Sequence, residues 1–350
     1  MQLQASKRID YIDLAKGFCI LLVVYGHSSF LPYSHGDAIQ NATSSFRMPL
    51  YFFLSGLFFK LYDGLGDFVR RKINRLIVPF VFWHLALSIV FPVIVESIRT
   101  ASFSLTPAYD NIKMIFHNEI CYNVALWFLL CLFVTNVLFY VIYKLSLKVE
   151  CFHIPILVTL SVTSGFIGWL LRVYEISLPL YIDSALTSLP FFAGGFFIKK
   201  YTGLLYGKFT WKSWVALILC FVPFIPLYIQ NEYCLDIRIN GFFINTFVVY
   251  LCGFTGTLFV LLLSKLIVHI PIVSYFGRYS IIILVLHCPL IYALTPIVDS
   301  IFANCNVTAR IWILFAIVSV ICGLLIYPCR KYLPQFTAQR DIFRGKTKDK

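Results

Sequence analysis

The sequence predicts an all-α protein with about ten transmembrane helices and both termini in the cytoplasm. Of its 350 residues, 60% are hydrophobic, 18% are aromatic and only 13% are charged, which is too apolar for a soluble enzyme. Apolar runs of about 20 residues recur to the end of the chain, and each is long enough to cross a bilayer. The net charge of +13 fits the Lys and Arg bias of cytoplasmic loops, so we expect no nucleic-acid partner.

The first apolar run, 14–31, follows a charged segment and has no small-residue cleavage site after it. We therefore interpret it as a retained first helix rather than a signal peptide. A short polar loop, 32–45, leads to a second helix at 46–60, and a basic stretch at 62–76 follows. The remaining helices are predicted at 77–97, 123–143, 154–172, 183–198, 213–230, 241–263, 279–297 and 310–328.

The distribution of positive charge gives the orientation. With the N-terminus inside, 23 of the 29 Lys and Arg residues fall on the cytoplasmic side. The six that fall on or beside outer loops are Arg47, Arg99, Lys113, Arg172, Arg238 and Arg310. A wrong helix count would invert every later loop and destroy this asymmetry. Without an internal repeat or a linker, the sequence indicates one membrane domain over 1–330 and a basic cytoplasmic tail over 331–350.

Two ionisable residues in the first helix are the candidate catalytic residues, Lys16 and His27. They are eleven residues apart, which is about three turns, so they lie on one face about 16 Å apart along the axis. Charged residues inside a membrane span are costly and often functional. His27 could take a proton from a hydroxyl or attack an acyl group itself. The alternatives are that Lys16 snorkels to the interface and that His27 only packs between helices.

The basic stretch offers a second candidate site. Arg71, Lys72 and Arg75 fall at helical spacing where the chain re-enters the membrane, and arginine presents a planar fork to phosphate oxygens. This pattern fits a clamp for a polyanionic ligand that arrives from the cytosol. Ordinary topology would also place basic residues here, because anionic headgroups attract them.

Two further residues are candidates for substrate binding. Arg47 begins the membrane part of the second helix, near His27, where it could neutralise an oxyanion or simply snorkel. His287 lies in the ninth predicted helix, two residues before Pro289. It could face the same cavity as His27, or bond a backbone carbonyl that the proline frees. The 11 cysteines contain no CxxC pair and lie mostly in apolar runs, so we expect neither a disulfide framework nor a metal site.

With these motifs in order, the chain resembles the acyltransferase 3 family of integral membrane acyltransferases. The resemblance rests on RIDYIDLAKG…VVYGHS, which holds Lys16 and His27, on MPLYFFLSGLFF, on FVRRKINRLIVPF, on ALWFLLCLF with Trp127, and on GRYSIIILVLH. Together they span residues 8–287. The sequence departs from the family at Lys16, where arginine is common, and at Arg47, where many relatives have histidine. The expected arginine pair of the basic loop becomes Lys72 with Arg75, or Arg71 with Arg75.

The resemblance implies transfer of an acyl group, usually acetyl, from acetyl-CoA to a hydroxyl of a carbohydrate or lipid-linked glycan at the bacterial inner membrane. It suits a CoA nucleotide on Arg71, Lys72 and Arg75, a thioester near His27, and a substrate site that includes Arg47, Trp127 and His287. No permanently bound cofactor is expected, since acyl-CoA is a substrate. Some relatives carry an outer hydrolase-like domain, and the 22 residues after the last predicted helix are too few for one.

Two other functions use the same features. Some relatives have been proposed to export polysaccharide, and a transporter or flippase of an acylated glycan would need the same intramembrane polar residues but no CoA clamp. A structural scaffold would explain the apolar bulk but not Lys16 and His27 on one helix face. Protection of the 71–75 loop by acetyl-CoA would separate the enzyme from the exporter.

Overall fold

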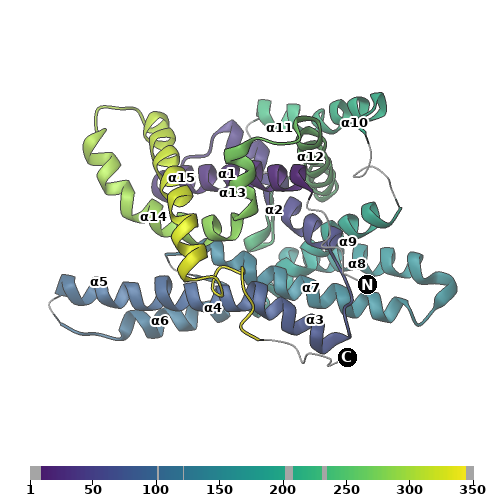
Figure 1. Cartoon of the computed structure of the whole chain (residues 1–350), viewed down its shortest axis with the longest axis horizontal. Helices are drawn as coiled ribbons and strands as arrows, with labels where there is room; N and C mark the ends of the chain where they lie inside the picture. Colours follow the sequence, from purple (N-terminus) through teal and green to yellow (C-terminus); the bar gives the residue numbers. More distant parts are fainter. Residues whose placement is uncertain (1–8, 101, 121, 202–207, 231–234, 344–350) are drawn as a thin grey trace.

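The fold was analysed in a computed structural model that describes residues 9–100, 102–120, 122–201, 208–230 and 235–343. Over this part of the chain nearly every element is helical (Figure 1). The first half contains α1 (Asp10–Tyr33), α2 (Ala38–Leu57), α3 (Leu65–Lys72), α4 (Val78–His84), α5 (Phe91–Thr100), α6 (Thr106–Met114), α7 (Trp127–Ser146) and α8 (His153–Val173). The second half contains α9 (Ile182–Tyr201), α10 (Trp211–Phe221), α11 (Phe224–Gln230), α12 (Thr246–Ile267), α13 (Pro271–Arg278), α14 (Ser280–Ile301) and α15 (Val307–Tyr332).

Short helical turns join several of these helices. The π-helical segments Ile73–Ile77 and Leu85–Val90 connect α3, α4 and α5 into one long helix. The 3₁₀ segments are Ile115–His117, Val124–Leu126, Glu150–Phe152, Pro179–Tyr181 and Ile237–Ile239. The basic stretch that the sequence placed in a loop before 77 is therefore the first part of a helix that begins at Leu65.

Eight helices in the described residues are long and apolar enough to cross a membrane. They are Asp10–Tyr33, Leu65–Ile94, Val124–Ser146, His153–Val173, Pro179–Lys199, Thr246–Ile267, Ser280–Ile301 and Val307–Tyr332. The protein is thus a multi-pass helical membrane protein. The spans predicted at 46–60 and 213–230 are not among the eight: the first corresponds to α2 and the second to the shorter helices α10 and α11.

The polar first half of α2 explains why this helix does not look like a membrane span. Gln40, Asn41, Ser44 and Arg47 lie in this half, and all four are buried. Their side chains therefore face the protein interior rather than lipid, and the central cavity described below lies against them. Polar groups inside a membrane protein are tolerated where they line a cavity or find partners.

Glycines allow close crossings of α9 on α2 and of α13 on α1. A Cβ atom on Gly56 of α2 would overlap the carbonyl oxygen of Phe192 of α9, and one on Gly195 of α9 would overlap that of Phe53 of α2. A Cβ on Gly277 of α13 would likewise overlap the backbone of α1 at Asp13. Lipid gives no hydrophobic force that holds membrane helices together, so they associate through close van der Waals packing. Small residues allow this packing because they let the backbones approach.

The only β-strands in the described residues form a small hairpin that the sequence did not predict. Strands β1 (Leu235–Asp236) and β2 (Gly241–Phe242) pair antiparallel, with Asp236 opposite Gly241. Asn240 turns the chain between them in the left-handed region, at φ 52°. The hairpin takes up residues that were expected to begin the eighth helix, and α12 starts only at Thr246.

Candidate active site

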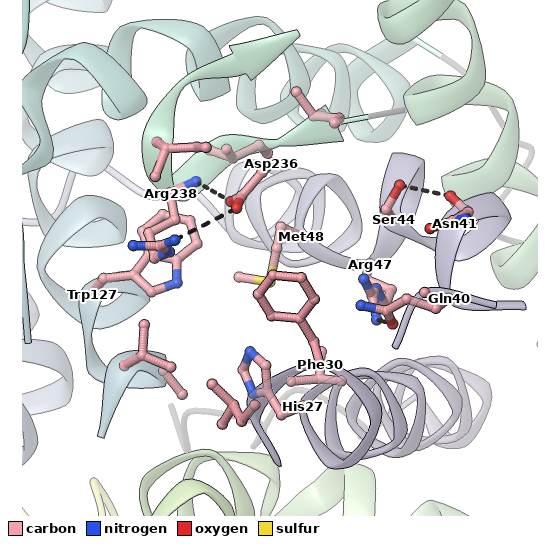
Figure 2. Close-up of a pocket in the computed structure, with 18 of the residues that line it drawn as sticks. His27, Phe30, Gln40, Asn41, Ser44, Arg47, Met48, Trp127, Asp236 and Arg238 are labelled. Atoms are coloured by element: carbon pink, nitrogen blue, oxygen red, sulfur yellow. Dashed lines mark hydrogen bonds and ion pairs between the residues drawn. The ribbon is translucent and has the colours of Figure 1, made fainter. Parts of the chain in front are cut away.

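A cavity of about 480 Å³ lies among α1, α2, α7, α14 and the hairpin (Figure 2). It brings together three residues that the sequence singled out from three separate segments: His27, Arg47 and Trp127. Its lining also includes Val23, Phe30, Leu31, Gly36, Gln40, Asn41, Ser44, Met48, Val124, Ala125, Leu235, Asp236, Ile237, Arg238, Ile239, Phe243 and Leu284. The cavity therefore has mostly apolar walls with a few polar side chains, as small-molecule sites usually do.

His27 and His287 form a stacked pair at the floor of this cavity. His27 Nδ1 lies 2.7 Å from His287 Nε2, and the two rings are parallel within 6°. His287 is fully buried behind His27 and does not itself line the cavity. The two histidines come from helices 260 residues apart, so only the packing of α14 against α1 brings them together.

Hydrogen bonding determines which nitrogen of His27 carries the proton. His287 Nδ1 lies 2.9 Å from the carbonyl oxygen of Ile283, which can only accept a hydrogen bond, so this nitrogen is the donor. In a neutral His287, Nε2 must then accept, and His27 Nδ1 must donate to it. The remaining nitrogen of His27, Nε2, is left with its lone pair free. The pair thus holds His27 in the tautomer that a general base requires.

Pro289 affects this region through a different side chain than the sequence suggested. Because proline has no N–H, the carbonyl of Val285 one turn earlier has no helical partner. Asn123 supplies the missing hydrogen-bond donor, since its Nδ2 donates to Val285 O at 2.8 Å. His287 does bond a carbonyl, but it is that of Ile283, which leaves Nε2 free to orient His27.

Cys288 completes a group of three possible metal ligands. The ligand atoms of His27, His287 and Cys288 all lie within 4.8 Å of one another, and Cys288 Sγ is 3.4 Å from both His27 Nδ1 and His287 Nε2. Two nitrogens bound to one tetrahedral zinc stand about 3.3 Å apart. The 2.7 Å between the histidines is shorter and matches a direct hydrogen bond. We therefore interpret the group as a hydrogen-bonded pair with a thiol beside it.

Arg47 is held in the cavity wall by bonds that direct its guanidinium toward α1. Its Nη1 donates to Gln40 Oε1 at 2.7 Å and to Leu22 O at 3.1 Å. A Cβ on Gly26, next to His27, would overlap Nη1 of Arg47 and Oε1 of Gln40, so a larger residue here would displace both side chains. Arg47 is only 8% exposed, so it is an interior cation beside His27 rather than a snorkelling residue.

The hairpin supplies Asp236 and Arg238, which the sequence analysis did not select as site residues. Asp236 accepts from the backbone N–H of Arg238 at 3.0 Å and lies 3.8 Å from its guanidinium (Figure 2). Arg238 and Trp127 line the same cavity. The only signal in the sequence was that Arg238 is one of six basic residues on the outer side. That signal identifies a side of the membrane, not a cavity.

Arg238 also belongs to the lining of two further cavities. It lines a cavity of about 910 Å³ that includes Asp110, Glu119 and Tyr292, and a smaller one of about 210 Å³ that includes Asp183.

The remaining predicted residues lie outside the cavity. Lys16 is on the same helix as His27 but near its other end, where its Nζ lies 5.9 Å from the ring centre of Phe58. Arg71 pairs with Asp67 at 2.8 Å, Lys72 lies over Phe68, and Arg75 bonds the carbonyl of Ala338. The structure thus brings His27, Arg47, Trp127 and His287 together and leaves Lys16 and the basic helix at a separate place.

A family model described as an acyltransferase domain matches residues 9–328. No curated protein and no solved structure matches the chain. The match covers most of the chain, including α1 with His27, the basic helix and α14 with His287, so the chain belongs to the acyltransferase 3 family of membrane acyltransferases.

Proposed function

We propose that this protein is an O-acyltransferase that transfers an acyl group, in the first instance acetyl, from acyl-CoA to a hydroxyl group of a cell-surface carbohydrate or lipid-linked glycan at the bacterial inner membrane. One observation carries the proposal. The hydrogen bond that His27 Nδ1 donates to His287 Nε2 leaves His27 Nε2 as a base in a cavity that two arginines also line. An exporter would gain nothing from a base held in one tautomer.

The geometry supports a direct transfer. The acceptor hydroxyl gives its proton to His27 Nε2 as its oxygen attacks the thioester carbonyl carbon. A new bond forms between oxygen and the acyl carbon, and the negative charge moves onto the carbonyl oxygen. The carbon–sulfur bond then breaks, and the departing CoA sulfur takes the proton from His27. Histidine can serve both steps because its ordinary pKa lies near 6.5.

The arginines have a defined role in this scheme. Arg47 and Arg238 line the same cavity as His27, and both would offer N–H donors to the oxyanion of the tetrahedral intermediate. Hydrogen bonds from a charged donor in a water-poor site are worth far more than in water. Trp127, which lines the same cavity, would give an apolar face for a sugar ring or for the acyl group.

The experiment that tests the proposal uses purified protein, radiolabelled acetyl-CoA and membrane-derived glycolipids. We expect label to move to a glycan with wild type and with His269→Ala, an exposed histidine outside the cavity. We expect transfer to be lost with His27→Ala while the protein still inserts and purifies as a folded monodisperse species. Full transfer by His27→Ala would contradict the mechanism. Absence of both transfer and CoA binding in wild type would favour an exporter.

A further inference from the structure

The cavity of about 910 Å³ that Arg238 lines has no part in the scheme above. We call it the vestibule, and the lining residues that matter here are Asp110, Asn111, Glu119, Tyr122, Arg238 and Tyr292. Leu31, Val124 and Arg238 line both the vestibule and the cavity that holds His27, so the two cavities share a wall. In the orientation that the positive charges predict, the vestibule lies on the outer side of the membrane.

Asn111 offers the vestibule a hydrogen-bond acceptor from a buried side chain. The residue is only 6% exposed, and its side chain bonds the carbonyl of Ser88. A carbonyl can only accept, so Nδ2 makes this bond and Oδ1 is left over. Within the described residues Oδ1 has no hydrogen-bond partner. Polar atoms of buried side chains normally have a partner, and a ligand hydroxyl in the vestibule would supply one.

Asp110 and Glu119 give the vestibule negative charge that is free to act on a ligand. In the described part of the chain neither carboxylate forms an ion pair or accepts a hydrogen bond. Arg238 lines the vestibule too, but its guanidinium already lies 3.8 Å from Asp236. A carboxylate can accept from two neighbouring hydroxyls or from an ammonium group, whereas it repels another carboxylate.

Two tyrosines provide an aromatic wall in the same cavity. The ring centres of Tyr122 and Tyr292 lie 6.2 Å apart, with the ring planes at 69°, and both side chains are exposed. Asn123 is fully buried and donates to Val285 O of α14, the helix that carries Tyr292, so the two rings are held in one arrangement. Tyrosine combines an apolar ring with a polar tip, which suits the C–H face and the hydroxyls of a sugar.

We propose that the vestibule binds the sugar units of the acceptor glycan that do not react, and that it selects neutral or amine-bearing sugars over acidic ones. The inference rests on the proposed function, because it assumes a glycan acceptor. The wall shared with the central cavity places a bound sugar chain next to the cavity of His27. Binding of the other units would then hold the reacting hydroxyl in position.

The test uses three β-1,4-linked trisaccharides, of glucose, glucosamine and glucuronic acid, which share one ring geometry and differ in charge. Their dissociation constants are measured by saturation-transfer NMR on the full-length protein in nanodiscs of zwitterionic lipid, without any acyl donor. We expect the glucose and glucosamine trimers to bind. The glucuronic acid trimer should bind at least about tenfold more weakly than the glucose trimer, because its carboxylates meet those of Asp110 and Glu119.

The charge variants test the selectivity separately from the fold. In the double variant Asp110→Asn, Glu119→Gln, the glucuronic acid trimer should approach the affinity of the glucose trimer, a gain of binding that a misfolded protein would not show. High salt should narrow the same gap in wild type and have little effect in the double variant. Asp63→Asn, an exposed acid outside the vestibule, is the control and should keep the selectivity of wild type.

The aromatic wall has its own variant. Tyr122→Leu keeps an apolar side chain but removes the ring, and we expect it to weaken binding of the glucose and glucosamine trimers by about fivefold, without a change in their order. Tyr174→Leu removes an exposed tyrosine outside the vestibule and should bind as wild type does.

The outcomes separate this inference from the proposed function. If no trisaccharide binds to wild type, or if the glucuronic acid trimer binds as tightly as the glucose trimer, the inference is wrong. Acyl transfer to glycolipids is measured independently and decides the acyltransferase proposal in either case. If the trimers bind with the expected selectivity but wild type transfers no acyl group, the glycan site is supported and the acyltransferase proposal fails.

Discussion

At the scale of single residues, the property that matters most is the identity of the atom that each histidine presents. His27 would be an ordinary polar residue in a membrane helix if its two nitrogens were equivalent. The nitrogens differ because His287 Nδ1 donates to the Ile283 carbonyl, so that His287 Nε2 accepts from His27 Nδ1 over 2.7 Å. In the proposed reaction His287 is thus a positioning residue, since it would act through His27.

Substitution of His287 should therefore impair catalysis rather than binding. We expect His287→Ala to lower kcat for acetyl transfer by about 10²-fold or more, in the range of general base catalysis, with the KM for acetyl-CoA nearly unchanged. His287→Gln should recover part of the rate, because its amide oxygen can accept from His27 Nδ1 as the imidazole does. Steady-state kinetics of the two variants check this.

The comparison of the two variants is decisive. If His287 serves only packing, alanine and glutamine will reduce kcat by the same factor, and the loss will follow the change in thermal stability. A rate that recovers with glutamine while the stability does not would support the positioning role.

At the scale of elements, the hairpin determines where Arg238 stands. It is anchored to the helical part by Asn240, whose side chain bonds Thr187 Oγ1 of α9 and the carbonyl of Gly168 of α8. Ser184 of α9 also donates to the carbonyl of Arg238 at 3.2 Å. These bonds fix a short segment that would otherwise be a mobile loop, so that Arg238 can face the cavity.

Removal of this anchor should loosen the cavity wall. We expect Asn240→Gly to lower the free energy of unfolding by about 1–3 kcal/mol, because the buried partners on α8 and α9 lose their bonds. Asn240→Ala should cost about 1 kcal/mol more, since alanine tolerates the left-handed conformation at φ 52° poorly. Thermal unfolding in detergent measures both.

The same variants carry a functional test. If the hairpin positions Arg238 for the acceptor, Asn240→Gly should raise the KM for the glycan and leave CoA binding unchanged. An unaltered acceptor KM in a variant that is measurably less stable would show that the hairpin supports the fold but not the site.

At the scale of the whole molecule, the last described residues close the chain onto its first third. The segment after α15 passes over α4 and ends beside α3 (Figure 1). Asn74 donates to Phe343 O at 2.9 Å and accepts from the N–H groups of Ile342 and Phe343. Phe336 stacks on Phe82, with ring centres 3.9 Å apart. Most of the tail predicted at 331–350 is thus packed as far as residue 343.

Asn74 is the residue on which this closure depends most. It is 1% exposed and makes three hydrogen bonds to the tail. We expect Asn74→Ala to destabilise the docked tail by about 1–3 kcal/mol, because the Asn74 bonds to the tail backbone are lost. Hydrogen–deuterium exchange over 333–343 should then become faster.

The control for this change is Ser104→Ala, which removes a hydroxyl that bonds Thr106 at the start of α6. Exchange of the tail should be unaffected by it. If Asn74→Ala leaves the tail protected, the aromatic stack of Phe336 on Phe82 is sufficient to hold it.

The sequence by itself determined the class of protein and its family, and it named four residues that the structure brings together: His27, Arg47, Trp127 and His287. Apolar runs of membrane length identify transmembrane helices because lipid cannot satisfy backbone hydrogen bonds, and the order of the motifs identified the family. His27 and Arg47 were predicted because ionisable groups in a membrane are costly. The spans predicted at 46–60 and 213–230 are not among the eight helices of membrane length and hydropathy. The first lies in α2, which buries a polar half, and the second is divided between α10 and α11.

The tertiary structure alone decided how these residues meet. Three contacts join segments far apart in the chain. His27 meets His287, the hairpin brings Arg238 to the cavity, and Lys16 and Lys199 both lie over the ring of Phe58. Hydropathy and helical spacing report the environment of one segment at a time. They contain no information on which face of α14 or α9 packs against α1 or α2. That choice depends on side-chain fit and glycine contacts between helices, which exist only in the folded protein.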